Sequence, residues 1–181
     1  MHSAQVSSED AVIVAPAVGP LSGPGSVGEA FMSLSSCLSD SPDKAPARLS
    51  EVTMRLTGGE SAGISLEDVE DGAPVFRWVA TAGELSRYLR GTMPRHFSPC
   101  GTVVDRGRAL VMSDPGRYYD YVRTKLHVPI RSALLVPYGR PGTFVGTLWV
   151  LTHTERGFTT EDVRAVQSLA TFASTILDRL Q

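Results

Sequence analysis

The sequence contains few of the residues that build disulfide frameworks or metal sites. Only two of its 181 residues are cysteine, Cys37 and Cys100, and its 4 histidines lie far apart, without HxH or HxxxH spacing. Two cysteines form neither a disulfide framework nor a cysteine-rich zinc site. We therefore expect no metal site, assign no cofactor, and expect a reducing, cytoplasmic setting.

Long apolar runs and an excess of one charge are also missing. The sequence has no run of about 18 apolar residues that would span a membrane, and its start lacks the basic region and apolar core of a signal peptide. The net charge of −2 gives no general attraction to nucleic acid or to an anionic membrane. We therefore expect neither as a partner.

The first part of the chain changes from a low-complexity composition to helical periodicity. Residues 1–25 are rich in Ser, Gly, Pro and Ala, and we expect them to form a disordered leader. Apolar residues at helical spacing then predict a helix from Val27, capped by Ser26. A second predicted helix has Pro46 in its first turn and stops at Gly58.

The rest of the chain alternates between strand and helix signals. Residues 61–83 read as a β-hairpin with Phe76, Trp78 and Ala80 on one face, and residues 108–115 read as a further strand. Residues 131–153 form a second hairpin around the turn GRPG. A capping box at Thr159 opens a long final helix. This order predicts an α+β fold around a mostly antiparallel sheet of five or six strands.

Several linked segments, in this order, resemble a GAF domain. They are the strand LLVP at 134–137, the strand VGTLW at 145–149 and the helix start FTTED at 158–162. The resemblance covers roughly residues 44–180 and is greatest to the subgroup found in bacterial sensor proteins and histidine kinases. It implies a GAF/PAS-like central sheet with helices on both faces and long N- and C-terminal helices.

The resemblance also divides the chain. Residues 26–181 are expected to form a single GAF domain. Within it, residues 26–58 hold the N-terminal helices, residues 60–158 hold the sheet and the pocket inserts, and residues 159–181 hold the C-terminal helix. In the family, the inserts between the central strands build a pocket for cyclic nucleotides, linear tetrapyrroles, haem or other small molecules.

Cys100 lies in the segment HFSPCGT and has three interpretations. Similarity to free methionine sulfoxide reductases makes it a candidate nucleophile, although the later insert at 114–130 has no second cysteine to resolve a sulfenic acid. Bilin attachment is a second interpretation, but His96 precedes the cysteine instead of following it. We favour the third, a small buried residue behind an N-cap at Ser98 and a Pro99 that opens a helix.

The candidate ligand contacts are drawn from the strands and inserts around the expected pocket. Trp78 comes from a strand, where plain core packing is the competing interpretation. The full candidate set is Trp78, Phe97, Cys100, Met112, Asp114, Tyr118 and Tyr119. No catalytic residue is assigned.

We therefore predict a non-catalytic sensory or regulatory GAF module of bacterial signal transduction, which binds a small molecule, a protein partner or both. Its terminal helices suit a homodimer, and a separate partner such as a histidine kinase would receive the signal. The alternatives are a free methionine sulfoxide reductase that uses Cys100 and a ligand-free dimerisation scaffold whose pocket is filled by its own side chains.

Overall fold

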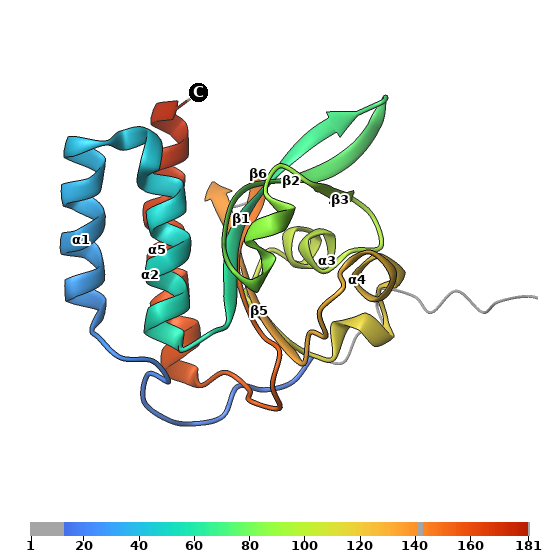
Figure 1. Ribbon diagram of the computed structural model, residues 1–181, viewed down its shortest axis with the longest axis horizontal. Coiled ribbons are helices and arrows are strands. Elements are labelled where there is room, and N and C mark those ends of the chain that lie inside the picture. Colours follow the sequence, from blue (N-terminus) through green and yellow to red (C-terminus); the bar gives the residue numbers. More distant parts are fainter. Residues whose placement is uncertain (1–12, 141–142, 181) are drawn as a thin grey trace, which may run out of the picture.

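A single six-stranded antiparallel sheet, with strand order β3-β2-β1-β6-β5-β4, organises the molecule (Figure 1). The computed structural model describes residues 13–140 and 143–180. The strands are β1 (Ser61–Glu70), β2 (Ala73–Gly83), β3 (Thr92–Pro94), β4 (Leu110–Ser113), β5 (Ser132–Arg140) and β6 (Thr143–Thr152). The α+β prediction is confirmed. β3 was not predicted, because three residues are too few to show alternation.

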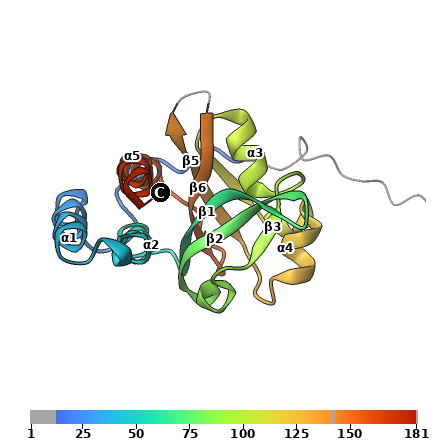
Figure 2. The same cartoon turned by 90° about the horizontal axis from the view of Figure 1, so that it is seen from above.

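Helices cover both faces of the sheet (Figure 2). On one face α2 (Ala45–Thr57) and α5 (Thr160–Leu180) pack on the strands, and α1 (Val27–Asp40) lies against these two helices. A short 3-10 turn, η2 (Pro42–Lys44), joins α1 to α2. The opposite face is covered by η3 (Glu84–Tyr88), α3 (Pro99–Arg106), η4 (Pro115–Arg117) and α4 (Asp120–Lys125).

The predicted helix ends are confirmed by their capping contacts. Glu29 N donates to Ser26 Oγ at 3.3 Å and Ser26 N donates to Glu29 Oε2 at 2.8 Å, which completes a capping box at α1. Gly58 ends α2 in the left-handed region, at φ 57°. Part of the predicted GRPG turn, residues 141–142, lies outside the described residues.

A β-bulge in β2 decides which side chains face the candidate pocket. Ile64 pairs with Ala80 and the next residue, Ser65, pairs with Trp78, so Val79 is the extra residue of β2. An extra residue shifts the alternation of the strand by one position. The prediction that Ala80 shares a face with Trp78 is therefore wrong. Ala80 packs with the helices and Trp78 packs on the other side.

Two apolar cores result, one on each face. The helix-side core includes Leu49, Ile64 and Leu169 from α2, β1 and α5. The pocket-side core includes Trp78 and Trp149 from β2 and β6. Because the two cores share one layer of strands, a displacement of these strands changes the packing of both cores.

Residues 13–25, named here the N-terminal strap, have defined backbone contacts along the base of the molecule, where the chain is blue in Figure 1. Three amides of the strap donate to carbonyls of β4, of the β6–α5 connection and of α2. The bonds are Val14 N to Val111 O (2.9 Å), Ala17 N to Phe158 O (3.1 Å) and Gly23 N to Leu56 O (2.9 Å). The predicted disorder is therefore wrong for residues 13–25, and residues 1–12 lie outside the described residues.

The physical reason is that the strap also contributes apolar side chains. Ile13 packs against the pocket-side core, whereas Val14 and Leu21 pack against the helix-side core. Burial of these side chains offsets the entropy lost when the Pro- and Gly-rich segment is ordered.

Candidate functional site

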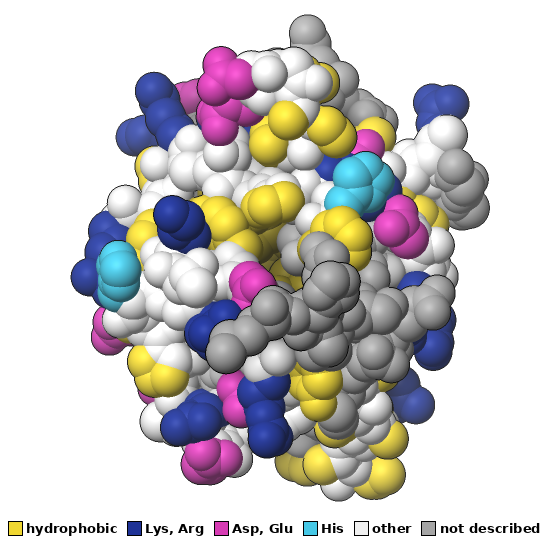
Figure 3. All heavy atoms as spheres, turned by 90° about the vertical axis from the view of Figure 1, so that its right-hand side faces the viewer, with side chains coloured by type: hydrophobic (Ala, Val, Ile, Leu, Met, Phe, Trp, Pro, Cys, Tyr) yellow, Lys and Arg dark blue, Asp and Glu magenta, His cyan; other side chains and the backbone are white. Residues whose placement is uncertain are grey.

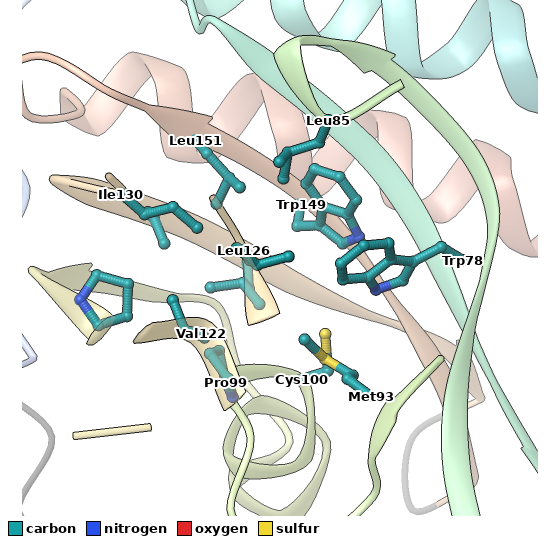
Figure 4. Close-up of a pocket in the computed structure, with 13 residues that line it drawn as sticks. Trp78, Leu85, Met93, Pro99, Cys100, Val122, Leu126, Ile130, Trp149 and Leu151 are labelled. Carbon is teal, nitrogen blue, oxygen red and sulfur yellow. The ribbon is translucent and has the colours of Figure 1, made fainter. Parts of the chain in front are cut away.

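A small apolar cavity lies between the sheet and the elements that cover its second face (Figure 4). Its volume is about 30 Å³. It is lined by Trp78, Leu85, Met93, Pro99, Cys100, Pro115, Val122, Leu126, Ile130, Ala133, Leu135, Trp149 and Leu151. Binding sites for larger ligands usually measure about 300–1,000 Å³, so this cavity is a closed form that must widen to admit a guest.

Cys100 reaches the cavity from the first turn of α3. Ser98 caps the helix by accepting from Gly101 N at 3.2 Å, and Pro99 occupies its first position, as predicted. Gly101 is required because a Cβ there would lie 2.1 Å from Arg95 O. This close approach is to the loop after β3.

The Cys100 thiol is buried and hydrogen-bonded to neutral groups. Thr147 Oγ1 donates to Sγ at 3.1 Å, and Sγ lies 3.7 Å from Ser65 Oγ. Burial raises the pKa of the thiol, and the hydrogen bonds with Thr147 and Ser65 and the charge of Arg95 oppose this only in part. The site therefore favours a neutral thiol, the opposite of what nucleophilic chemistry requires.

Two tryptophans form the wall above Cys100, with ring centroids 6.0 Å apart. Trp149 Nε1 donates to Ser65 Oγ at 2.9 Å. Trp78 Nε1 is also buried but has no hydrogen-bond partner among the described residues. Gly63 lies beneath Trp149, where a Cβ would come within 2.3 Å of the indole ring.

The structure brings part of the predicted site together. Trp78 and Cys100 line the cavity. Met112 and Tyr119 are buried in the same pocket-side core, without lining the cavity. The Tyr119 hydroxyl instead lies 2.8 Å from Thr102 Oγ1, a contact within the layer of α3 and α4.

The other three predicted residues lie further out. Phe97 is 61% exposed and has a φ of 57°, so its ring lies on the surface of the loop before α3. Tyr118 is half-buried at the edge of the pocket-side core. Asp114 faces an outer groove, and its carboxylate lies 3.8 Å from Arg117 Nε.

That outer groove, of about 330 Å³, runs along η4, α4 and the segment after α4. Val122, Leu126 and Ile130 line both the groove and the inner cavity, so they form the partition between the two. In Figure 3, apolar side chains line a hollow on this side of the molecule, with charged side chains and histidines around it.

The partition was missed in the sequence. Its signal was present, because Val122, Leu126 and Ile130 recur at intervals of four within the irregular insert. The polar neighbours of Cys100 could not be found this way. They are Ser65 and Thr147. They come from β1 and β6 and meet the cysteine only through the sheet register.

Among the described residues, no group of three His, Cys, Asp or Glu side chains comes close enough to hold a metal ion. Within the same ranges, no helix has the length and apolar character needed to cross a membrane.

A family model described as GAF domain matches residues 47–178. The chain belongs to the GAF family. No curated protein matches this GAF chain significantly in sequence. Among solved structures, it is similar to the GAF domain of a phosphoenolpyruvate-protein phosphotransferase from Coxiella burnetii, with a TM-score of 0.71 and 13% identity, over 84% of this chain and 93% of that one.

Two further similar structures have different functions in their names. The chain is similar to a free methionine-R-sulfoxide reductase from Neisseria meningitidis, solved with its substrate, with a TM-score of 0.64 and 18% identity over 91% of this chain and 96% of that one. It is also similar to the chromophore-binding domain of a Stigmatella aurantiaca bacteriophytochrome, with a TM-score of 0.63 and 15% identity over 84% of this chain and 60% of that one. At these identities the similarity establishes the fold alone.

Proposed function

We propose that this chain is a non-catalytic sensory GAF module that binds a small molecule between the sheet and the α3–α4 layer. The observation that supports this most directly is the two-part cavity. The inner apolar cavity, named here the chamber, and the outer groove share three aliphatic side chains, Val122, Leu126 and Ile130, which separate them. A guest would enter by displacing them and would be sealed from water when they return.

The state of Cys100 supports a role without catalysis. Reduction of a sulfoxide starts with attack by a thiolate on sulfur and needs a second thiol to discharge the resulting sulfenic acid. Cys100 is 2% exposed and burial raises its pKa, and Cys37, the other cysteine, lies on α1 beyond the sheet. The reductase alternative therefore has little support from the described residues.

The sheet offers a route from the chamber to the terminal helices. Adjacent residues of β5 point to opposite faces, with Leu135 lining the cavity and Leu134 packing in the helix-side core. Val166 and Leu169 of α5 belong to that same core. A guest that shifts β5 and β6 would change how α5 packs, and a separate signalling protein would read this change.

The test uses the protein's 5 methionines, labelled with ¹³C at their methyl groups. Met93 lines the cavity, whereas Met32 is 74% exposed on α1. A metabolite library is screened by thermal shift, since a ligand at 100 times its Kd stabilises by about 2.7 kcal/mol. A true ligand must move the Met93 signal saturably, and a shift of the Met32 signal in addition would report the change in the terminal helices. The proposal is overturned if no compound does so.

A ligand-free dimerisation scaffold is the second candidate, and the small volume of the cavity, about 30 Å³, favours it.

In either case we propose a homodimer through the terminal helices, because Met32 is an exposed large apolar side chain on the outer helix α1. Met32→Glu should weaken self-association in sedimentation equilibrium. An unchanged monomer mass for both proteins contradicts the dimer.

A further inference from the structure

We propose that the chamber takes a small, uncharged, mainly apolar molecule with one hydrogen-bond acceptor, placed opposite Trp78 Nε1. This inference rests on the proposed function, because it presumes that the α3–α4 side binds a ligand. It then goes further, since it names the chemical class of that ligand and the single polar contact that selects it.

The walls exclude a charged guest. None of the side chains that line the chamber is ionisable at neutral pH, since Cys100 is held as a thiol. The charge that acts on Cys100 is that of Arg95, which pairs with the carboxylates of Glu67 and Asp105. Its Nη1 is buried without a partner among the described residues, but Arg95 is not one of the side chains that line the chamber. An ionised carboxylate or phosphate buried in such a chamber would lose its hydration without gaining a partner.

The polar groups that border the walls are engaged with one another. Ser65 Oγ accepts from Trp149 Nε1, and Thr147 Oγ1 donates to the sulfur of Cys100. A guest rich in hydroxyl or amide groups would therefore find few free partners at this level of the sheet. This favours a ligand with little polarity.

Among the side chains that line the chamber, one buried donor remains available. Trp78 is 2% exposed, and its Nε1 has no hydrogen-bond partner among the residues that the structure describes. In Figure 4, the edge of the Trp78 indole that holds this nitrogen is turned toward Met93 and Cys100, across the chamber. A buried N–H without a partner is costly, so an acceptor on the guest removes that cost.

The direction of this donor is fixed by packing. The Trp78 ring makes an edge-to-face contact with Tyr88 and a tilted contact with Trp149. The ring centroids lie 5.9 Å apart in the first pair and 6.0 Å apart in the second. These contacts leave the indole little freedom to turn its N–H toward solvent. The acceptor of the guest must therefore be at one position, which makes the contact selective.

Size sets the remaining limit. The chamber measures about 30 Å³, and a displacement of Leu126 into the outer groove, which it also lines, would widen it for a guest. An apolar cavity of about 150 Å³ can hold benzene, so one substituted ring is a reasonable upper bound. Cyclic nucleotides and tetrapyrroles exceed it.

The experiment follows the indole N–H signals of ¹⁵N-labelled protein, of which there are two because the chain has 2 tryptophans. Acetophenone supplies a ring and one acceptor, ethylbenzene supplies a similar shape without an acceptor, and benzoate supplies a charge. Acetophenone should shift the Trp78 signal saturably and bind about fivefold more tightly than ethylbenzene. Benzoate should leave the spectrum unchanged.

The Trp78 signal is assigned with Trp78→Phe, in which the preference for acetophenone over ethylbenzene should disappear. If that variant does not fold, Trp149→Phe assigns the same signal by elimination, and the preference is read on the unmodified protein. Leu126→Ala, which opens the partition, should strengthen the binding of both neutral probes.

The outcomes separate the two proposals. Saturable binding of benzoate or cyclic GMP that moves Met93 and not the Trp78 N–H overturns the ligand class and leaves the sensory function standing. Equal affinity for acetophenone and ethylbenzene also overturns it. If no probe or library compound moves any signal of the chamber, even in Leu126→Ala, both proposals fail.

Discussion

The carboxylate of Asp162 joins two segments that lie 140 positions apart. Its Oδ2 accepts the hydroxyl of Ser22 at 2.6 Å and its Oδ1 accepts the Ser22 amide at 2.9 Å. The same carboxylate accepts Thr159 N at 2.8 Å, which caps α5. One fully buried acidic side chain therefore fixes both the start of α5 and the N-terminal strap.

Replacing Asp162 should destabilise the fold strongly. Asp162→Ala removes three charge-assisted hydrogen bonds, one of which is the capping contact with Thr159 N, so we expect a loss of about 3 kcal/mol in the free energy of unfolding, measured by urea titration. Asp162→Asn keeps an acceptor and should lose less. The neighbour Glu161 pairs with Arg164 at the surface, so Glu161→Ala should change stability by less than about 0.5 kcal/mol. Equal effects at 161 and 162 would contradict the role of Asp162.

The strap can be dislodged by one methyl group at Gly23. A Cβ there would lie 1.9 Å from Arg55 O and 2.4 Å from Gly58 N, both backbone atoms that cannot swing aside. We expect Gly23→Ala to lower Tm and to speed hydrogen exchange at the Val14 and Ala17 amides, which are bonded in the folded protein.

Gly157→Ala is the matched control, because a Cβ at Gly157 would meet nothing within 4 Å. It should leave both readouts near those of the unmodified protein. Slow exchange of the Val14 and Ala17 amides in Gly23→Ala would show that the strap does not depend on its close approach to α2.

Much of the fold was readable from local signals, because helix caps and turn glycines act on their own neighbours. Ser26 with Glu29 and Thr159 with Asp162 each satisfy backbone amides within four residues. The strap was misread because its partners are distant. Residues of low complexity become ordered here through carbonyls of β4, α2 and the β6–α5 connection.

The site was less predictable than the fold. Trp78 and Cys100 were identified because aromatic and thiol side chains stand out in a sequence. Phe97 stood out equally, but its left-handed backbone turns it to the surface, and no periodicity reveals a backbone angle. The prediction for Ala80 failed for a similar reason, because the bulge at Val79 turns it into the helix-side core and an inserted residue is visible only in the pairing register.

The burial of Cys100 predicts a slow thiol. When the folded protein is alkylated with iodoacetamide at pH 7.5, Cys37, which is half-buried, should react roughly tenfold faster or more, because Cys100 must wait for local opening. Mass spectrometry of the two peptides measures the rates. In urea both cysteines should react readily. Preferential labelling of Cys100 in the folded state would revive the reductase interpretation.

The burial of Cys100 and Tyr138 predicts that the free energy of unfolding decreases at alkaline pH. Burial raises the pKa of Cys100, and it raises that of Tyr138 well above its usual range. In the unfolded chain a thiol ionises near pH 8.5 and a phenol near pH 10. As the pH rises, these groups therefore lose their protons first in the unfolded state. Their contribution to the free energy of unfolding is complete below about pH 8.5, and it is lost as the pH rises toward their folded-state pKa values. Each group contributes a slope of at most about 1.4 kcal/mol per pH unit.

Urea titrations between pH 7 and pH 10.5 measure this slope, and one variant of each of these two groups tests its contribution. Cys100→Ala should flatten the curve between about pH 8.5 and 10, whereas Tyr138→Phe should flatten it only above about pH 10. Tyr138→Phe also removes the hydrogen bond that the phenol donates to Ser65 O at 3.0 Å, so its stability at pH 7 should fall by about 1 kcal/mol. A stability that stays constant to pH 10 in the unmodified protein, or an identical slope in Cys100→Ala, would contradict the buried neutral thiol on which the uncharged chamber depends.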